Sequence, residues 1–119
     1  MNKEDLIKRT KQFSHNCIKT ALKLPENTLG WHLQKQLIRC STSVAANYRA
    51  TCHALSKTAF ISKLSIVIEE ADESDFWLEF IIDENLIKDK NILELKKESN
   101  ELSSIFIKSR ITAQNNKNN

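Results

Sequence analysis

The chain has 119 residues, 40% of them hydrophobic and 28% charged, a balance that suits one globular domain. One glycine and one proline are too few for the turns of an all-β fold, so the composition indicates long helices. No apolar run approaches the roughly 20 residues that cross a bilayer, and the charged start has no apolar signal-peptide region. These features predict a cytoplasmic protein that does not enter a membrane.

The formal net charge of +3 conceals two strongly charged regions of opposite sign, which cancel, and three basic residues in 102–119 supply the remainder. Residues 1–63 carry eleven basic and three acidic side chains, whereas residues 64–101 carry four basic and twelve acidic ones. Opposed charges of this kind fix orientation and partner choice in complexes. The asymmetry therefore predicts that the basic region of one copy can meet the acidic region of another.

Two helices are predicted in the basic half of the chain. Apolar residues recur at three- and four-residue steps over residues 4–23, which predicts a first helix that Pro25 ends. Thr28 can cap a second helix over residues 28–53. Residues 41–46 of this helix are rich in small side chains, which would allow a neighbouring helix to approach closely.

Two further helices complete the domain. Ser56 can cap a third helix over residues 57–87, and the apolar pattern predicts a fourth over residues 91–112. The connections are short, so consecutive helices should be antiparallel. We therefore predict an all-α, up-down four-helix bundle as a single domain over residues 1–112. The polar tail, 113–119, has nothing to bury and is predicted to be disordered.

The second and third helices have more apolar residues than one core face needs. A bundle helix needs an apolar stripe about 100° wide or somewhat more. Exposed aromatics beyond such a stripe usually mark an interface, although a long helix buried on three sides is the alternative explanation. The surplus residues, which we predict to form an oligomer interface, are Trp31, Ile38, Ile66, Phe76, Trp77 and Phe80.

Residues that carry chemistry do not gather into a recognisable motif. Cys17, Cys40 and Cys52 form no C-x-x-C pair, which predicts reduced, packed thiols. No histidine follows a glutamate at the Glu-x-x-His spacing of di-iron bundles, and there is no glycine-rich phosphate loop or nucleophile–base pair. The sequence predicts no catalytic residue, no cofactor, no metal site and no small-molecule substrate.

Asn47 lies on the core-facing stripe of the second helix. A buried amide there can hydrogen-bond between helices and fix their register, as polar core residues do in other bundles. We therefore predict that Asn47 is a structural polar residue of the core; a ligand contact is the alternative.

The third helix carries a dense group of carboxylates that needs partners. Glu69, Glu70 and Glu73 can pair with Arg39 and Arg49, inside one subunit or across an interface. The same arginines can contact phosphates, and the carboxylates can face solvent or bind a divalent cation. The sequence alone leaves these roles open.

The first helix has a basic side that is the best candidate for nucleic-acid contact. Between Asp5 and Glu26 it has no carboxylate. Repeated around an oligomer, such charges would create a strong, salt-sensitive field for phosphates. A solvated basic face is the alternative. The candidate contact residues are Lys8, Arg9, Lys11, Lys19 and Lys23.

The second helix carries a motif that resembles a known family. Its R-x-S-x-S-[VI]-x-x-N pattern is matched by Arg39, Ser41, Ser43, Val44 and Asn47, and an acidic, aromatic third helix follows. The chain thus resembles the bacterial four helix bundle protein family, also called the 23S rRNA intervening-sequence proteins, over about residues 5–110. Many relatives have an acidic–glycine pair after the asparagine, where this chain has Tyr48-Arg49-Ala50.

The resemblance implies a left-handed four-helix bundle that assembles as a homopentamer, with no enzymatic activity and an undefined cellular role. The related accessory variability proteins of retroelements form basic pentameric barrels that bind nucleic acid. Two hypotheses follow for this chain. It is a non-catalytic, self-assembling scaffold or adaptor with a protein partner, or it is a nucleic-acid-binding accessory protein that uses its basic face.

Overall fold

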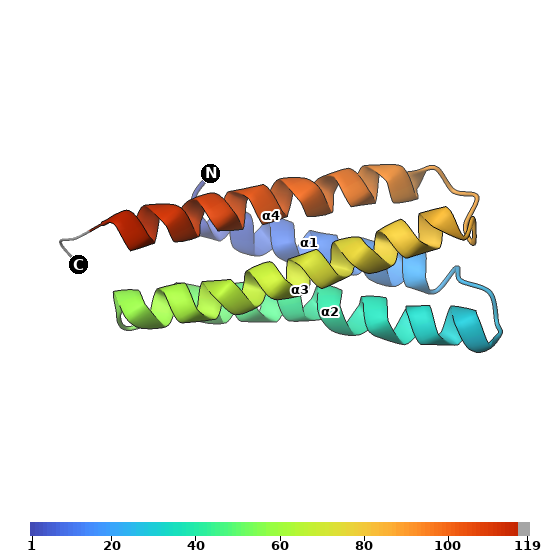
Figure 1. Cartoon of the computed structure of the whole chain (residues 1–119), viewed down its shortest axis with the longest axis horizontal. Coiled ribbons are helices and arrows are strands. Elements are labelled where there is room, and N and C mark those ends of the chain that lie inside the picture. Colours follow the sequence, from blue (N-terminus) through green and yellow to red (C-terminus); the bar gives the residue numbers. More distant parts are fainter. Residues whose placement is uncertain (117–119) are drawn as a thin grey trace.

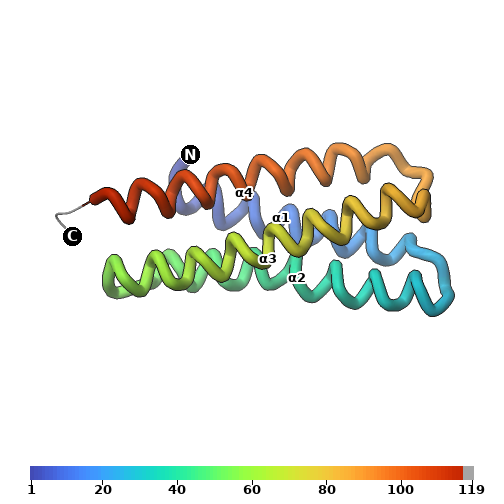
Figure 2. The backbone as a smooth tube through the Cα atoms, in the orientation of Figure 1, coloured from blue at the N-terminus to red at the C-terminus, as the bar shows by residue number. Residues whose placement is uncertain are grey.

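The computed structural model describes residues 1–116. The helices are α1 (Lys3–Ala21), α2 (Thr28–Cys52), α3 (Lys57–Asp83) and α4 (Asn91–Asn115). Consecutive helices run in opposite directions along a body about 52 Å long and 21 Å wide (Figures 1 and 2). The prediction of an all-α four-helix bundle is confirmed.

The helix starts are set by local capping side chains. The Ser56 hydroxyl accepts a hydrogen bond from the backbone N–H of Ala59 at 3.1 Å, as predicted for the start of α3. The predicted cap of α2 is wrong by one residue. Asn27 caps that helix by accepting from Gly30 N–H at 2.9 Å, and Thr28 is the first helical residue. An asparagine immediately before the threonine competes for the same position because its side-chain oxygen reaches the same N–H group.

α3 ends earlier than the predicted residue 87. Asn85 adopts the left-handed conformation, with φ of 53°. Its N–H donates to Ile82 O at 3.0 Å, and the N–H of Leu86 donates to Ile81 O at 3.2 Å. These two bonds form a Schellman motif, which satisfies the last carbonyls and turns the chain toward α4. The apolar residues after this turn had made the helix look longer in the sequence.

α4 continues past the predicted end at residue 112 to Asn115. The half-buried Ala113 lies in this extension, and the Lys57 ammonium donates to the backbone carbonyl of Asn116. Residues 113–115 of the predicted disordered tail are therefore helical, because the start of α3 supports them. The last part of that tail, 117–119, lies outside the described residues.

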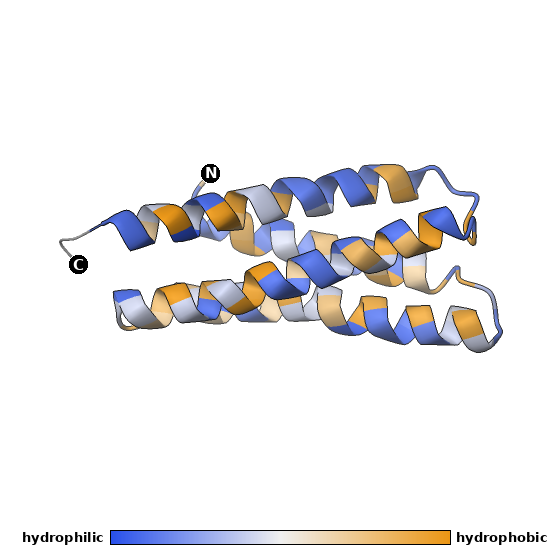
Figure 3. Cartoon of the chain, in the orientation of Figure 1, coloured by the Kyte–Doolittle hydropathy of each residue, from blue (hydrophilic) through white to orange (hydrophobic). Residues whose placement is uncertain are grey.

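The core is built from one stripe of each helix. The hydropathy colouring shows hydrophilic and hydrophobic patches alternating along the helices (Figure 3). Tyr48 of α2 and Phe106 of α4 meet across the core with ring centroids 5.5 Å apart. Burial of such side chains, each contributing about 1.5–3 kcal/mol, drives association of the helices. The largest fully buried apolar side chains are Phe13, Leu33, Leu37, Val44, Leu64, Val67, Leu78, Ile81, Leu102 and Phe106.

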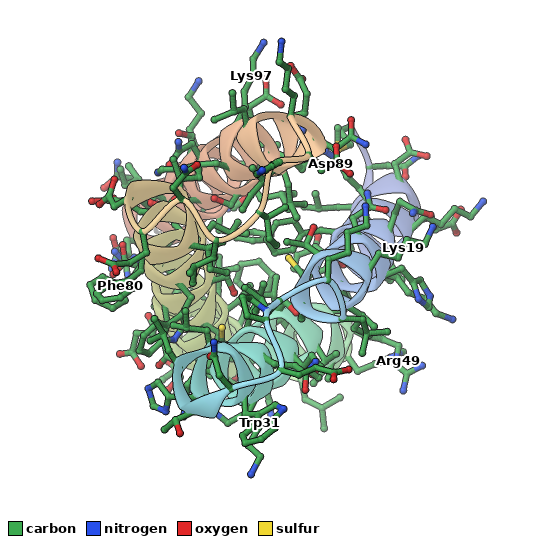
Figure 4. The ribbon with its side chains drawn as sticks, turned by 90° about the vertical axis from the view of Figure 1, so that its right-hand side faces the viewer. Lys19, Trp31, Arg49, Phe80, Asp89 and Lys97 are labelled. Atoms are coloured by element: carbon green, nitrogen blue, oxygen red, sulfur yellow. The ribbon has the colours of Figure 1, made fainter. Side chains whose placement is uncertain are left out.

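The four helices occupy the corners of a square (Figure 4). Neighbouring corners are α1–α2, α2–α3, α3–α4 and α4–α1, so α1 is diagonal to α3. The α1–α4 side is the most loosely packed of the four. The outer faces of α1 and α3 therefore point in opposite directions.

Within the described part of the chain, no helix is both long enough and apolar enough to cross a membrane.

Candidate functional site

Three aromatic side chains form a cluster on the outside of α3. The rings of Phe76 and Trp77 meet edge to face with centroids 4.9 Å apart, and Phe80 lies 6.1 Å from Phe76 and 6.3 Å from Trp77. Phe76 is 52% exposed and Phe80 is 38% exposed. Figure 4 shows Phe80 pointing away from the bundle. We call these three residues the aromatic cluster.

The other predicted interface residues divide into two groups. Trp31 and Ile66 are exposed, and Trp31 points outward from α2 (Figure 4). Ile38 and Trp77 are half-buried and pack against the core of their own chain. The expectation that these two residues are surplus to the core is therefore wrong in part. A helix at a corner of the square contacts two neighbours, so its buried arc is wider than one narrow stripe.

Trp77 also belongs to a polar network between α2 and α3. Its indole N–H donates to Glu73 Oε2 at 3.3 Å, and the guanidinium of Arg39 donates to the same carboxylate oxygen. Arg39 Nη1 is 3.5 Å from Glu70 Oε2. The His32 ring meets Trp77 edge to face at 5.6 Å. Among the alternatives left open for Arg39, the structure places this arginine on the carboxylates of its own chain.

The acidic residues of α3 separate into paired and unpaired groups. Asp75 Oδ1 accepts from Lys96 Nζ at 2.9 Å and from the hydroxyl of Ser99 at 2.7 Å, which ties α3 to α4. Glu69 and Asp72 are exposed and have no hydrogen bond or ion pair within residues 1–116. Among the described residues, no group of three or more His, Cys, Asp or Glu side chains lies close enough to hold a metal ion.

The prediction for Asn47 is wrong about its hydrogen bond. Asn47 is half-buried, and its amide donates to the carbonyl and the hydroxyl of Ser43 at 2.9 and 2.8 Å, one turn earlier in the same helix. Ser14 instead makes a buried bond between α1 and α2, through a hydroxyl that donates to Ser41 O at 2.7 Å. Serine performs this role because its short side chain lets the two backbones approach closely.

The basic side of α1 is partly neutralised by α4. Arg9 donates to both carboxylate oxygens of Glu98 at 2.7 and 2.6 Å and to Glu101 at 2.9 Å. The hydrogen bond to Glu98 is the main reason why the pKa of Arg9 is raised. Lys23 Nζ lies 2.6 Å from Asp89 Oδ2, and this contact lowers the pKa of Asp89. These partners could not be identified from the spacing within one helix.

Three of the predicted basic residues remain available to a partner. Lys8, Lys11 and Lys19 are exposed and form no ion pair within the described residues. Lys19 projects outward from α1 in Figure 4. Arg49 is also exposed, without a hydrogen bond or ion pair in this part of the chain, and projects outward near α1 (Figure 4).

A groove lies on each side of α1. The larger, about 900 Å³, lies against α4 and is lined by both basic and acidic side chains, including the Arg9–Glu98 pair. The smaller, about 340 Å³, lies against α2. Its lining residues include Ile7, Lys11, His15, Ile18, Ala45, Ala46 and Arg49, without any carboxylate. We call it the α1/α2 groove.

Sequence reasoning missed the α1/α2 groove, although a signal for it was present. By itself, the small-residue run of α2 predicts only a surface for close helix packing. Ser41 does serve that purpose, but Ala45 and Ala46 lie further out and form the groove wall. A small residue leaves a depression wherever its neighbours on both helices are longer.

The three cysteines are free thiols, as predicted; Cys17 and Cys40 are buried and Cys52 is half-buried. Burial raises the pKa of Cys40 to about 11 and raises that of Cys17 further. A raised pKa keeps the thiols protonated and unreactive at neutral pH. Both side chains therefore act as core residues.

Comparisons with known proteins agree with this architecture. A profile of the 23S rRNA-intervening sequence protein family matches residues 2–108. The chain is similar to the crystal structure of a protein with unknown function from the S23 ribosomal protein family of Bacteroides thetaiotaomicron. The two share 26% sequence identity with a TM-score of 0.82, over 92% of this chain and 98% of the other. No curated protein gives a match.

The family profile covers the first three helices and most of α4, and the structural similarity extends over the same bundle. The resemblance that the second helix suggested is confirmed. The chain belongs to the 23S rRNA-intervening sequence protein family.

Proposed function

We propose that this protein is a non-catalytic cytoplasmic scaffold that works by self-association, as a homo-oligomer with the five subunits that its family resemblance implies. The observation that carries the proposal is the aromatic cluster. Phe76 and Phe80 are not required by the core, yet they stand together on an outer face. Exposed aromatic surface of this kind usually marks a protein–protein interface, where such rings are enriched.

The charge distribution supports a copy of the same chain as the partner. Exposed carboxylates of α3 and exposed cations of α1 and α2 are on the same molecule. Such a surface attracts its own copies with a defined orientation. The free thiols, two of which are buried, support a reducing compartment.

Light-scattering mass at micromolar concentrations tests the proposal. We expect the wild-type protein to have the mass of an oligomer, and the double variant Phe76→Ser/Phe80→Ser to have the mass of one chain. Leu93→Ser is the matched control, because Leu93 is an exposed apolar residue of α4 outside the cluster. We expect this control to keep the wild-type mass. A wild-type protein that has the mass of a single chain would contradict self-association.

Nucleic-acid binding is a second candidate, favoured by the unpaired lysines of α1. Lys8 and Lys19 project from one helix without carboxylate partners in the described residues. The family name refers to an intervening sequence in ribosomal RNA, which makes structured RNA the first ligand to try. Contacts from lysine to phosphate would make the binding strongly salt-dependent.

Filter binding with RNA and DNA at low salt tests this second function. We expect retention that Lys8→Glu/Lys19→Glu weakens and that Lys35→Glu, on the exposed side of α2, leaves unchanged. Lys8 and Lys19 are chosen because neither lines the α1/α2 groove. If no nucleic acid is retained by the wild-type protein, this second function is wrong and the scaffold proposal is unaffected.

A further inference from the structure

The exposed side of α3 carries a continuous acidic and aromatic stripe. Glu69, Asp72, Phe76 and Phe80 follow one another at steps of three and four residues, so they share one face of the helix. All four are exposed. The buried residues Ala71, Ser74 and Leu78 occupy the opposite face, toward the core. We call these four exposed residues the acidic–aromatic ridge.

The α1/α2 groove has complementary chemistry. Ile7, Ile18 and Ala46 give it apolar walls, and Lys11 and Arg49 supply positive charge that no carboxylate of the described residues neutralises. An aromatic ring suits the apolar walls, and a flanking carboxylate suits the cations. The larger groove beside α4 lacks this match, because it contains carboxylates as well as cations, and its Arg9 already binds Glu98 and Glu101.

The ridge and the groove lie on different sides of the same bundle. Phe80 projects from α3, whereas Arg49 projects from α2 near α1, on another side (Figure 4). α1 and α3 occupy diagonal corners of the square. One molecule therefore cannot close its own ridge onto its own groove, and the partner surface has to come from another molecule.

Two hydrogen bonds place the ridge and the groove at one height along the bundle. Ser14, which lines the groove, donates to Ser41 O of α2 at 2.7 Å. Ser74, between Asp72 and Phe76 in sequence, donates to Cys40 Sγ at 3.2 Å. Because Ser41 and Cys40 are adjacent in α2, these bonds lie in one cross-section of the bundle. A contact between ridge and groove then repeats with little displacement along the long axis.

We infer that copies of this chain associate head to tail, with the acidic–aromatic ridge of one copy seated in the α1/α2 groove of the next. This inference rests on the proposed self-association and specifies its surfaces. A contact between two different patches generates a ring when the rotation closes and a filament when it does not. The common height of ridge and groove favours a ring, because successive copies do not climb along an axis.

Mixing two variants tests the inference. Ala46→Glu blocks the groove with a longer, negatively charged side chain, and Phe76→Ser/Phe80→Ser removes the apolar part of the ridge. All three positions are exposed, so we expect the bundle to fold, which far-UV circular dichroism and thermal unfolding would check. Alone, each variant should have the mass of one chain. An equimolar mixture should have the mass of two chains and no more, because only one ridge and one groove remain intact.

A control variant separates the effect of an added charge from blockage of the groove. Ser104→Glu introduces the same charge at an exposed site on α4 and should keep the wild-type mass. If Ala46→Glu keeps the wild-type oligomer while the ridge variant is monomeric, the interface joins two ridges and the head-to-tail inference is wrong. A mixture that stays monomeric would also overturn it. In both cases the wild-type protein remains an oligomer, so self-association itself would stand; a monomeric wild type would remove both.

Charge exchange gives an independent check within one chain. Lys11→Glu/Arg49→Glu should reduce the oligomer to single chains at low salt, as should Glu69→Lys/Asp72→Lys. Combining all four substitutions exchanges both charges and should restore the wild-type mass. A fourfold variant that remains monomeric while its helical content is unchanged would contradict the proposed pairing.

Discussion

Gly30 occupies a position of α2 where no side chain fits. A Cβ atom added there would lie 1.7 Å from the carbonyl oxygen of Pro25 and 2.7 Å from its carbonyl carbon. Both atoms belong to the backbone, which cannot move aside as a flexible side chain can. The close approach lets the chain turn tightly after Pro25 and enter α2.

We predict that Gly30→Ala destabilises the protein by about 1–3 kcal/mol, the usual cost of overpacking. The sign of this stability change is informative, because alanine in an unobstructed helix stabilises a protein by about 0.5–1 kcal/mol relative to glycine. Urea unfolding at neutral pH measures the change. Lys35→Ala, at an exposed site of the same helix, should have little effect. A stabilised Gly30→Ala protein would show that the steric argument is wrong.

The buried thiols predict a loss of stability at alkaline pH. The ordinary pKa of a thiol is 9.0 here, and burial raises that of Cys40 to about 11. Below pH 9 the Cys40 thiol is protonated in both the folded and the unfolded state, so its ionisation does not lower the free energy of unfolding. As pH rises from 9 to 11, the unfolded state loses its proton first, so stability falls by up to about 1.4 kcal/mol per pH unit for this group.

Cys40→Ser tests this linkage because a serine hydroxyl does not ionise in this range. We expect the variant to lose stability less steeply than the wild type between pH 9 and pH 11, whatever its stability at pH 7. Cys17 and Tyr48, whose pKa values are also raised by burial, should leave a residual slope. Urea midpoints across the range measure the slopes. Parallel slopes in the two proteins would contradict a raised pKa for Cys40.

At the scale of an element, α3 has both of its ends fixed by local chemistry. Ser56 accepts a hydrogen bond from an N–H group at the start. At the end, the left-handed conformation of Asn85 allows the last carbonyl groups to accept hydrogen bonds. Between these ends the helix serves the core on one face and presents the acidic–aromatic ridge on the other. Its apolar residues extend around more of its surface than a monomer requires, which is why its pattern was ambiguous in the sequence.

We predict that Ser56→Ala destabilises the protein by about 1 kcal/mol, because the N–H of Ala59 loses its acceptor. Ser62→Ala, an exposed position inside the same helix, makes the identical chemical change without removing a cap. This control should be neutral or slightly stabilising, since alanine has the higher helix propensity. Thermal unfolding of the two variants side by side measures the difference. Equal stabilities would show that the cap does not matter.

At the scale of the whole molecule, the charges are arranged across the diagonal of the bundle. α3 has seven carboxylates and two lysines, whereas α1 has five basic and two acidic residues. These two helices are held apart by the core, so their opposed charges cannot neutralise each other within the chain. The loosely packed α1–α4 side is instead bridged by the guanidinium of Arg9, which forms ion pairs with Glu98 and Glu101.

We predict that Arg9→Met lowers the free energy of unfolding by about 1 kcal/mol or less, since the pair is partly exposed and screened by solvent. Methionine keeps the apolar stem of the side chain and removes the charge. Hydrogen exchange in the first turns of α1 should become faster. Lys23→Met, which removes a more exposed pair with Asp89, should have a smaller effect. Unchanged hydrogen exchange in α1 would show that the Arg9 ion pairs do not stabilise the contact between α1 and α4.

The sequence by itself determined the four helices, their starts to within one residue, the core stripe of each and the family. These features are local: periodicity, caps and breakers act within a few residues, as Ser56 and Pro25 show. Where local signals competed, the capping residue changed, as at Asn27, or the helix ended earlier, as at Asn85. The sequence also identified exposed aromatics on α3, because one helix face can be counted along a single element.

Only the tertiary structure decided which faces meet. Arg9 and Glu98 lie 89 positions apart, and no spacing rule could pair them. The α1/α2 groove is built from two helices whose separation depends on the small residues between them. The ridge and the groove lie at one height on different sides of the bundle because interhelical hydrogen bonds fix the register. Helical periodicity fixes the direction of a side chain relative to the axis of its helix. The packing of the helices decides which neighbour lies in that direction.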